Sequence, residues 1–372
     1  MKVLHLISGG DTGGAKTHVL SLVEKLSEDI QIKLVCFIED QFYEDGKKLG
    51  LDIEVYQQKN RFDFSVVSRL KELIEKEGYD LVHCHGARAN FIAMFLKSKV
   101  KVPFVTTIHS DYKLDFKDNL YKKIIFTGLN EMALRKFDYY IAVSNNFKKM
   151  LVERSFDSEK IFTVYNGIDL EKTVDIIEKK EFLSKYGIDA TNKKIIGIAA
   201  RLDTNKSVNT LIEAGKELSS MRDDFLILIA GTGEEKHHLE QLIQQEGLSQ
   251  KIYLLGFVRE NYSFFNALDI NVLTSKSESF PYVILEGAKL GKTIISTDVG
   301  GIADLVEQGI NGYLFEVENK NELAKYLDES LKNDCYKNMG DNLKTKVSEL
   351  FSLDKMGRDH VKIYHTIKKT RI

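Results

Sequence analysis

The sequence predicts an α/β protein made of two doubly wound domains with parallel sheets. Short apolar runs alternate with segments of helical period along the whole chain, which is the pattern of repeated βα units. The chain has 372 residues, enough for two domains that each bury a core. A charged stretch without a strand-like run, residues 169–193, separates two series of apolar runs and is predicted to be a linker.

The strands are expected where the apolar runs occur. In the first domain, residues 1–168, they are predicted at residues 3–7, 32–37, 81–85, 104–108, 139–143 and 161–164. In the second domain, residues 194–350, they are predicted at residues 195–200, 225–230, 252–255, 270–273, 293–296 and 313–315. Residues 351–372 carry apolar side chains at helical intervals and are predicted to form a C-terminal helix.

Composition and charge narrow the range of functions. The chain has 43% hydrophobic and 29% charged residues, and no apolar stretch nears the roughly 20 residues of a transmembrane helix, so a cytoplasmic protein is expected. The net charge of −2 argues against nucleic-acid binding. Residues 88–154 hold thirteen Lys and Arg against six Asp and Glu, which makes this region a candidate for contact with an anionic membrane surface. Three cysteines without metal-ligand spacing fit a reducing compartment.

The strongest candidate site lies in the second domain. Glu278 and Glu286 are carboxylates separated by seven residues, and Pro281 between them suits the first turn of a helix. The unpaired N–H groups at the start of such a helix favour a phosphate. Arg201 and Lys206 follow a predicted strand, at the edge where α/β sheets bind ligands. Together these charged residues predict a diphosphate site.

These residues carry a resemblance to a known family. The segment from Glu278 to Glu286 resembles the E-x7-E motif of retaining GT-B glycosyltransferases of family 4 (glycosyl transferases group 1), and Arg201 with Lys206 resembles their phosphate clamp. Further segments match in the family's order, at residues 106–110 with the acceptor-side histidine, 166–169, 298–302 and 311–315. The resemblance covers essentially the whole chain. It implies the GT-B architecture, with two Rossmann-like domains facing a central cleft and a C-terminal helix that crosses back to the N-terminal domain.

The resemblance also implies roles for individual residues. Arg201 and Lys206 would neutralise the donor diphosphate, while Glu286 would bind the ribose. The donor-binding set is Arg201, Lys206, Gly233, Arg259, Glu278, Ser279, Phe280, Pro281, Tyr282, Glu286 and Gly14. The acceptor-binding set is Gly13, Gly14, His85 and His109, and the catalytic set is His109, Glu278, Arg201 and Lys206. Ser207 departs from the family pattern, because glycine usually follows the clamp lysine.

The implied activity is the retaining transfer of a sugar from a nucleoside diphosphate to a hydroxyl acceptor. UDP is expected because it is the family's commonest donor nucleotide, and a lipid-linked or growing surface glycan is the expected acceptor. The chain contains no Asp-x-Asp, the carboxylate pair that holds a metal on the diphosphate in another glycosyltransferase fold. The site is therefore expected to need no metal and no other cofactor, since cationic side chains and a helix start take that role.

Several alternatives stay open from the sequence. Residues 10–17 nearly match a P-loop, with Ala15 in place of the final glycine, but no strand end offers the aspartate that such NTPases use for Mg²⁺. The run His-Cys-His at residues 83–85 suggests metal ligands, yet no second cluster has ligand spacing, and a structural or substrate-contact role is favoured. A GT-B sugar-nucleotide epimerase and a non-catalytic transferase partner are further possibilities. Residues 114–137 are predicted as an amphipathic helix that packs on the core or faces a membrane.

Overall fold

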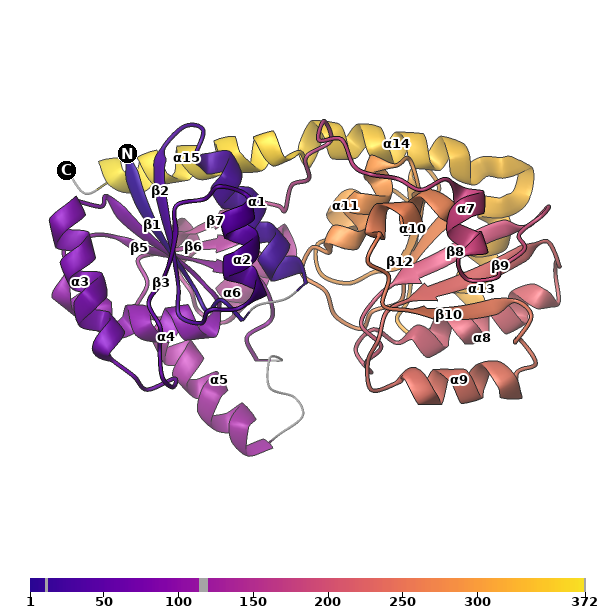
Figure 1. Ribbon diagram of the computed structural model, residues 1–372, viewed down its shortest axis with the longest axis horizontal. Helices are drawn as coiled ribbons and strands as arrows, with labels where there is room; N and C mark the ends of the chain where they lie inside the picture. The colour runs from indigo at the N-terminus through magenta and orange to yellow at the C-terminus, as the bar shows by residue number, and fades with distance from the viewer. Residues whose placement is uncertain (11–12, 114–119, 371–372) are drawn as a thin grey trace. The chain divides into compact units, whose positions relative to one another are not determined.

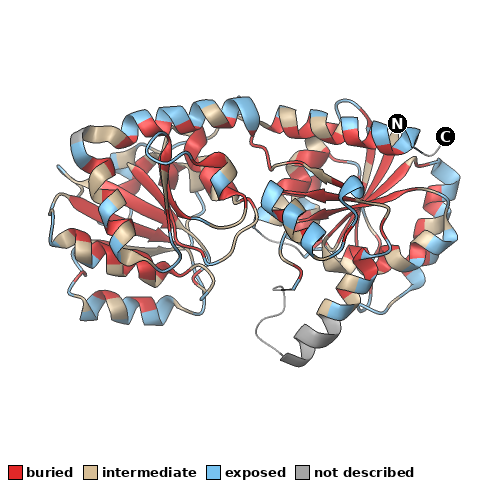
Figure 2. Cartoon of the chain, turned by 180° about the vertical axis from the view of Figure 1, so that it is seen from behind, coloured by how far each residue is buried: buried red, intermediate tan, exposed pale blue. Residues whose placement is uncertain are grey.

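The computed structural model describes residues 1–10, 13–113 and 120–370 (Figure 1). The chain divides into two compact units. Unit 1 comprises Met1–Gly167 and Leu353–Ile372, and unit 2 comprises Ile168–Ser352. In each unit the strands are largely buried, while the helices that cover them expose one face to solvent (Figure 2).

Unit 1 is built on a seven-stranded parallel sheet with the order β3-β2-β1-β4-β5-β6-β7. This order steps outward from β1 in both directions, as in doubly wound Rossmann-like domains. Its strands are β1 (Lys2–Ile7), β2 (Gln31–Cys36), β3 (Ile53–Val55), β4 (Leu81–His85), β5 (Phe104–Ile108), β6 (Tyr139–Ala142) and β7 (Ile161–Thr163). The sequence did not predict β3, because this edge strand has three residues and its central Glu54 is exposed.

Helices cover both faces of this sheet (Figure 1). They are α1 (Gly14–Leu26), α2 (Gln41–Lys48), α3 (Ser65–Glu77), α4 (Gly86–Leu96), α5 (Leu120–Leu134), α6 (Asn145–Glu153) and α15 (Leu353–Lys369). The last helix, α15, packs against α1, so that Met356, Tyr364 and Ile367 share an apolar core with Val19 and Leu22. The end of the chain is therefore part of unit 1 although it follows unit 2 in sequence.

Unit 2 is built on a six-stranded parallel sheet with the order β10-β9-β8-β11-β12-β13. Its strands are β8 (Lys194–Ala199), β9 (Phe225–Ala230), β10 (Ile252–Gly256), β11 (Ile270–Leu273), β12 (Thr293–Thr297) and β13 (Gly312–Phe315). Its helices are α7 (Lys179–Ser184), α8 (Val208–Ser219), α9 (Lys236–Gln245), α10 (Asn261–Ala267), α11 (Tyr282–Lys289), α12 (Ile302–Leu305), α13 (Lys320–Leu331) and α14 (Cys335–Leu350). The pairing of β8 with β11 sets the loops after these two strands side by side.

The segment expected to be a linker belongs to unit 2. It contains α7, whose Phe182 and Leu183 are buried against Ile195 and Phe264. The sequence did not predict α7, because its two buried apolar residues are adjacent, give no helical repeat and lie among many charged residues. Buried Lys289 also holds its first part, because its ammonium donates to the backbone carbonyls of Asp169 and Lys172 at 2.7 and 2.6 Å.

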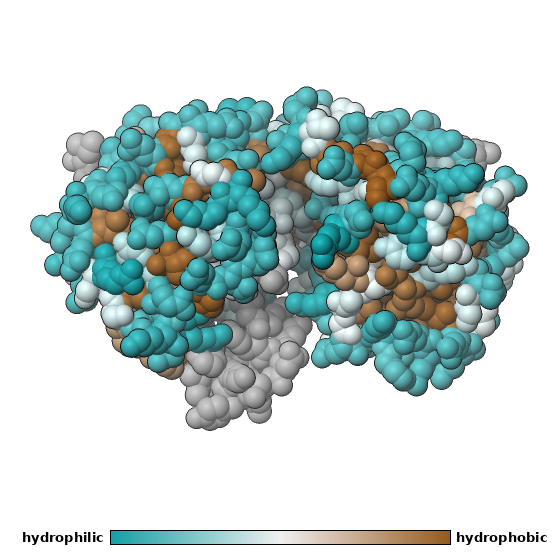
Figure 3. Space-filling view, viewed as in Figure 1, coloured by the Kyte–Doolittle hydropathy of each residue, from teal (hydrophilic) through white to brown (hydrophobic). Residues whose placement is uncertain are grey.

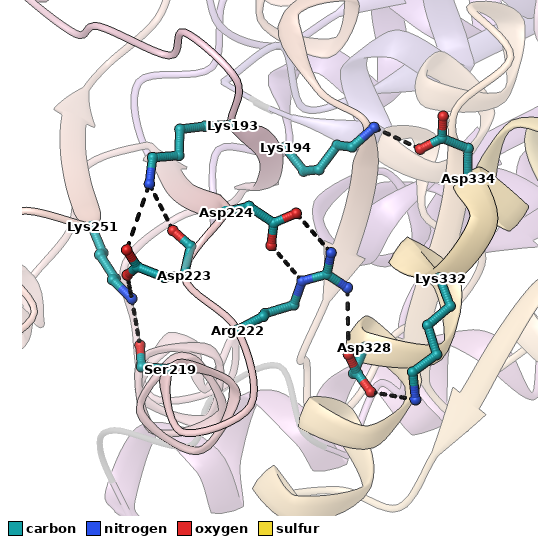
Figure 4. A network of polar contacts seen from close by, with 10 residues as sticks. All are labelled: Lys193, Lys194, Ser219, Arg222, Asp223, Asp224, Lys251, Asp328, Lys332 and Asp334. Carbon is teal, nitrogen blue, oxygen red and sulfur yellow. Dashed lines mark hydrogen bonds and ion pairs between the residues drawn. The ribbon is translucent and has the colours of Figure 1, made fainter.

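A polar network lies at the amino ends of the unit 2 strands (Figure 4). Arg222 donates to both carboxylate oxygens of Asp224, at 2.6 and 2.8 Å, and also reaches Asp328 at 3.3 Å. Lys251 pairs with Asp223 at 2.5 Å, and Lys194 pairs with Asp334 at 2.6 Å. Lys194 begins β8, the other members precede β9 and β10, lie on α13 or lie just before α14, and the network therefore fastens the sheet edge opposite its carboxyl ends.

On the face drawn in Figure 3, hydrophilic side chains cover most of both units, and smaller hydrophobic patches interrupt them. Within the described part of the chain, no helix combines the length and the apolar character needed to cross a membrane.

Candidate functional site

The loops at the carboxyl ends of the unit 2 strands are joined to one another. The backbone N–H of Lys276, after β11, donates to Asn205 O, after β8, at 2.7 Å. The Asn205 side chain donates in return to Ser277 O at 3.1 Å. Gly301, after β12, donates its N–H to Ser279 O at 2.8 Å. These bonds give a preformed set of loops in which the predicted charged residues sit.

Lys206 and Glu278 form the centre of this edge. The Lys206 ammonium lies 2.5 Å from Glu278 Oε1, and the Ser275 hydroxyl donates to the same oxygen at 2.6 Å. The two side chains are 21% and 12% exposed, so the pair is partly shielded from water but open to a ligand. A cation and a carboxylate that satisfy each other in this way are poised to exchange partners with a phosphate and a sugar hydroxyl.

Arg201 does not join this pair. Its guanidinium contacts the carboxylate of Asp203, and its side chain is 72% exposed. The other oxygen of Asp203 accepts from the backbone N–H groups of Asn205 and Lys206, at 3.0 and 3.1 Å, and shapes the turn that presents Lys206. The turn ends at Ser207, whose φ of 46° is left-handed, which explains why glycine would be the usual residue there.

Two glycines are required by close backbone contacts. A Cβ at Gly233 would lie 2.1 Å from Leu202 O, so the loop after β9 packs directly on the loop after β8. A Cβ at Gly300, whose φ is 61°, would lie 2.0 Å from Glu278 O. Both positions therefore exclude any side chain, and Gly300 supports the loop that carries Glu278.

The helix predicted from Pro281 begins one residue later. Pro281 is the N-cap residue, with ψ of 130°, and α11 runs from Tyr282 to Lys289. Phe280 is buried and stacks on Phe351, with ring centroids 5.1 Å apart, which anchors the entry to the helix. The start of a helix such as α11 is a favourable place for an anion, because the first backbone N–H groups and the helix dipole both favour negative charge there.

Glu286 lies one turn into α11 in a shielded position. Burial raises the pKa of its carboxyl above the ordinary value. Asn261, on α10, donates to Glu286 Oε2 at 2.8 Å and partly offsets this effect. The pKa of neighbouring Tyr282 is also raised, mainly by burial and secondly by the nearby Glu286 carboxylate. The buried Tyr282 hydroxyl has no hydrogen-bond partner among the described residues. A carboxylate with one oxygen held and one side open suits a pair of vicinal hydroxyls.

The glycine loop of unit 1 precedes α1. Gly13 caps the helix with φ of 64°, and Gly14 is its first residue. Lys16, the residue that a P-loop would aim at phosphate, instead pairs with Asp45 on α2 at 2.6 Å. Because Lys16 is engaged with Asp45, the described part of this loop argues against the P-loop interpretation. Residues 11–12 of the motif lie outside the described part of the chain.

His85 and His109 lie at the carboxyl ends of β4 and β5, as predicted, and they are in contact. His85 Nδ1 lies 3.1 Å from His109 Nε2. His85 is buried and His109 is half-buried. Burial lowers the pKa of His109 to about 4, with a smaller contribution from His360, so the ring is neutral at pH 7. A neutral imidazole at this edge can accept a hydrogen bond from a hydroxyl or donate one to it.

A cavity of about 280 Å³ lies next to the same edge of unit 1. Its lining combines two guanidinium groups, Arg61 and Arg88, with two aromatic rings, Phe62 and Phe91. The buried Asn130 side chain also lines it, and its Oδ1 has no hydrogen-bond partner in the described structure. The Phe62 and Phe91 rings meet edge to face with centroids 5.9 Å apart, and Phe62 is 56% exposed. The cavity thus joins positive charge, an apolar surface and a hydrogen-bond acceptor.

The sequence found the charged centre of unit 2 but missed what surrounds it. Asp203, Ser275 and Asn261 hold Arg201, Glu278 and Glu286 respectively. Arg259, predicted to bind the donor, lies in the exposed loop between β10 and α10. Of the amphipathic helix predicted at residues 114–137, residues 114–119 lie outside the described residues, and α5 covers Leu120–Leu134. In unit 1 the sequence missed the cavity and the histidines that surround His85, because their contacts join residues far apart in the chain.

Two units with Rossmann-like parallel sheets define a protein of the GT-B fold class. A solved structure of Anabaena Alr3699/HepE with UDP-glucose superposes with a TM-score of 0.83 over 98% of this chain and 100% of that chain, at 22% identity, and shows the same fold. Residues 12–172 match the family model described as Glycosyltransferase Family 4, and residues 179–346 match the model described as Glycosyl transferases group 1. The chain belongs to this GT4-type family of GT-B glycosyltransferases.

Curated relatives resemble the chain over most of its length. N-acetyl-alpha-D-glucosaminyl L-malate synthase of Bacillus anthracis is 28% identical over 82% of this chain and 80% of its own. UDP-Gal:alpha-D-GlcNAc-diphosphoundecaprenol alpha-1,3-galactosyltransferase of Escherichia coli is 27% identical over 74% of this chain and 73% of its own. The first relative is named for L-malate and the second for a sugar on diphosphoundecaprenol, so the two names differ in the acceptor.

Proposed function

We propose that the protein transfers a sugar from a UDP-sugar to a hydroxyl of a lipid-linked or growing surface glycan, with retention of the anomeric configuration. The observation that carries this proposal is the contact between Lys206 and Glu278 beside the start of α11, with Glu286 one turn further along. One cation, one helix start and two carboxylates match the phosphates, sugar and ribose of such a donor.

In this proposal unit 2 binds the donor. Lys206 leaves Glu278 for the diphosphate, and Arg201, already exposed, turns from Asp203 to the same group. Glu278 then accepts hydrogen bonds from hydroxyls of the donor sugar, while Glu286 accepts from the ribose. Two cationic side chains and the first N–H groups of α11 neutralise the leaving diphosphate, so no divalent cation is needed there.

Transfer proceeds on one face of the sugar. The bond between the anomeric carbon and the phosphate oxygen breaks, and the acceptor oxygen bonds to the same carbon from the same side. The acceptor's proton passes to the departing phosphate oxygen, which therefore acts as the base. His109 contributes by a hydrogen bond on the acceptor side, and the main work of the protein is to stabilise charge in the transition state.

Unit 1 binds the acceptor in this proposal. The cavity beside Gly10 offers Arg61 and Arg88 for phosphate, and Phe62 and Phe91 for an apolar or sugar face. An acceptor that carries a diphosphate next to a lipid fits both features, and the Escherichia coli relative is named for an acceptor of that kind. The basic region of residues 88–154 would add peripheral contact with an anionic membrane.

A donor and acceptor screen tests the proposal. The full-length protein is incubated in EDTA with UDP- and GDP-sugars and a short prenyl-diphosphate-linked N-acetylhexosamine, and product configuration is read by proton NMR. We expect UDP release that depends on the acceptor and an α-product from an α-donor. A β-product would overturn retention, and dependence on added Mg²⁺ would overturn metal independence. Rapid epimer formation without acceptor would favour the epimerase alternative.

A further inference from the structure

The interior of unit 1 contains a group of imidazoles that the proposed function leaves unexplained. This histidine cluster consists of His5, His18, His83, His85, His109 and His360. The sequence argued against a metal site because His83 and His85 have no second pair at ligand spacing. The fold supplies the missing partners from β1, α1, α15 and the end of β5. All members except His109 are buried.

Part of the cluster forms a continuous chain of hydrogen bonds. His85 Nε2 lies 3.0 Å from His5 Nδ1, and His5 Nε2 lies 3.3 Å from the Tyr364 hydroxyl. The same hydroxyl lies 2.6 Å from His83 Nδ1, and His83 Nε2 lies 2.8 Å from the Thr107 hydroxyl. If each group donates toward Thr107, every ring nitrogen from His85 Nε2 to His83 Nε2 has a partner. His85 Nδ1 then keeps its lone pair, and its contact is His109 Nε2 at 3.1 Å.

His18 presents a second lone pair near that of His85. Its Nδ1 donates to Asn166 Oδ1 at 2.8 Å, which fixes the neutral tautomer with the lone pair on Nε2. That buried Nε2 has no hydrogen-bond partner among the described residues. A carbonyl that orients the far nitrogen is the usual support of a metal-binding histidine. His109 Nε2 completes the group, because its ring lies 4.6 Å from the His18 ring, centroid to centroid.

We propose that His18 Nε2, His85 Nδ1 and His109 Nε2 bind a divalent transition-metal ion of the Zn²⁺ class. One nitrogen from each residue lies within 4.8 Å of the others, and His85 Nδ1 and His109 Nε2 are already 3.1 Å apart. Tetrahedral Zn²⁺ with bonds of about 2.0–2.1 Å needs nitrogens about 3.4 Å apart, so small side-chain rotations close the site. Three imidazoles and no carboxylate exclude Mg²⁺ and Ca²⁺ as its natural occupants.

The alternative triad of His5, His83 and His85 is a weaker candidate. Its nitrogens lie equally close, but both nitrogens of His5 and of His83 already have partners in His85, Tyr364 and Thr107. The proposed group contains one such contact, between His85 and His109, and His18 Nε2 has no partner among the described residues. The half-buried position of His109 also gives the proposed site an approach from solvent and a fourth position for water. The effect of the metal on activity rests on the proposed function. The metal would bind His109, the imidazole proposed to face the acceptor, so the metal-free protein should transfer sugar and Zn²⁺ should inhibit the transfer.

Metal titration of the chelator-treated full-length protein tests the site without any substrate. Co²⁺ is followed by the visible absorption of a tetrahedral nitrogen site, and Zn²⁺ by competition with a chromogenic chelator. We expect one tight equivalent per chain. His18→Gln should remove it, and Asn166→Ala should weaken it by about 10- to 100-fold, as loss of an orienting partner does. The double variant His237→Gln/His238→Gln, on exposed α9 of unit 2, should bind as the wild type does.

Three results would overturn the site. They are the absence of binding by the wild type, tight binding that survives His18→Gln, and loss of binding in the control at exposed α9. A His83→Gln variant separates the two triads, because it should keep the tight equivalent. Circular dichroism confirms that each variant is folded. Sugar transfer is measured separately, and if Zn²⁺ binds through His18 without inhibiting transfer, the inhibitory role fails together with the acceptor-side role of His109.

Discussion

Unit 1 and unit 2 share the doubly wound plan but place different chemistry at the carboxyl ends of their strands. Unit 1 gathers neutral, buried imidazoles that are held by one another and by Tyr364. Unit 2 sets a cation and a carboxylate in loops, with the side chains of Lys206 and Glu278 21% and 12% exposed. A buried network is rigid because each partner is needed to satisfy the next. A partly exposed pair can exchange partners. Unit 1 therefore carries a rigid polar network at this edge, whereas unit 2 carries an ion pair that can rearrange when a charged ligand binds.

Replacing the cation of unit 2 should give the largest effect on activity. We expect Lys206→Ala to lower kcat/KM by about 10²- to 10³-fold, or roughly 2.7–4 kcal/mol, because a group that stabilises the leaving charge is lost. The variant should remain folded. Lys276→Ala is the matched control, since Lys276 lies in the Glu278 loop but pairs with Glu318 at the surface. Equal losses in both variants would show that loop packing, not the ammonium, governs transfer.

Glu286→Gln should weaken UDP binding by about 10- to 100-fold, because a hydrogen bond to a charged group contributes roughly 1.5–3 kcal/mol. The same change should stabilise the protein at pH 7. The folded-state pKa of Glu286 is raised by burial, so its stabilising contribution is present below the ordinary value of 4.5 and is lost as pH rises through the raised pKa. Calorimetry and thermal melts from pH 4 to pH 8 measure both effects.

The stabilities of wild type and Glu286→Gln should converge at the acid end of that range and separate as pH rises. Wild-type affinity for UDP should fall as pH is lowered through the same window. A stability difference that is independent of pH would mean that the carboxyl does not titrate between these limits.

Tyr364→Phe should destabilise unit 1 by about 1–3 kcal/mol, because His83 and His5 then lose a buried hydrogen-bond partner. Hydrogen exchange of peptides from β1 and β4 reports the loss within that unit. Tyr326→Phe, whose hydroxyl bonds Glu322 on the surface of unit 2, is the control and should change exchange little. If β1 and β4 exchange as slowly in Tyr364→Phe as in the wild type, the network contributes little to the rigidity of unit 1.

The smallest effect is expected at the edge of unit 2 opposite the site. Arg222→Ala should lower the free energy of unfolding by about 1 kcal/mol, since ion pairs near the surface contribute little singly and Arg222 makes several. UDP affinity should not change. A shift in affinity would mean that the amino and carboxyl edges of the sheet are energetically coupled.

Much of the fold could be predicted from the sequence because buried parallel strands read as apolar runs. The run at residues 195–200 coincides with β8 to within one residue, while short β3 left no such run. The segment before β8 was misjudged because α7 buries two adjacent residues among many charges.

The candidate site was predictable only in part. Motif spacing identified Lys206 and Glu278, but not that they touch, because 72 residues separate them and the pairing of β8 with β11 brings them together. The sequence contains only a weak indication that His18 belongs to a site, namely its position in the first turns of a helix that follows a glycine pair. Nothing in the sequence linked it to Asn166, which is 148 residues away.

The mutual neutralisation of Lys206 and Glu278 has a consequence for selectivity. A free inorganic phosphate that binds the ammonium takes away the cationic partner of the carboxylate and leaves it with the hydrogen bond from Ser275. A diphosphate that carries a sugar brings a replacement for each half in one molecule. Under the proposed function, the contact would favour the intact donor over small anions that can replace only one partner of the pair.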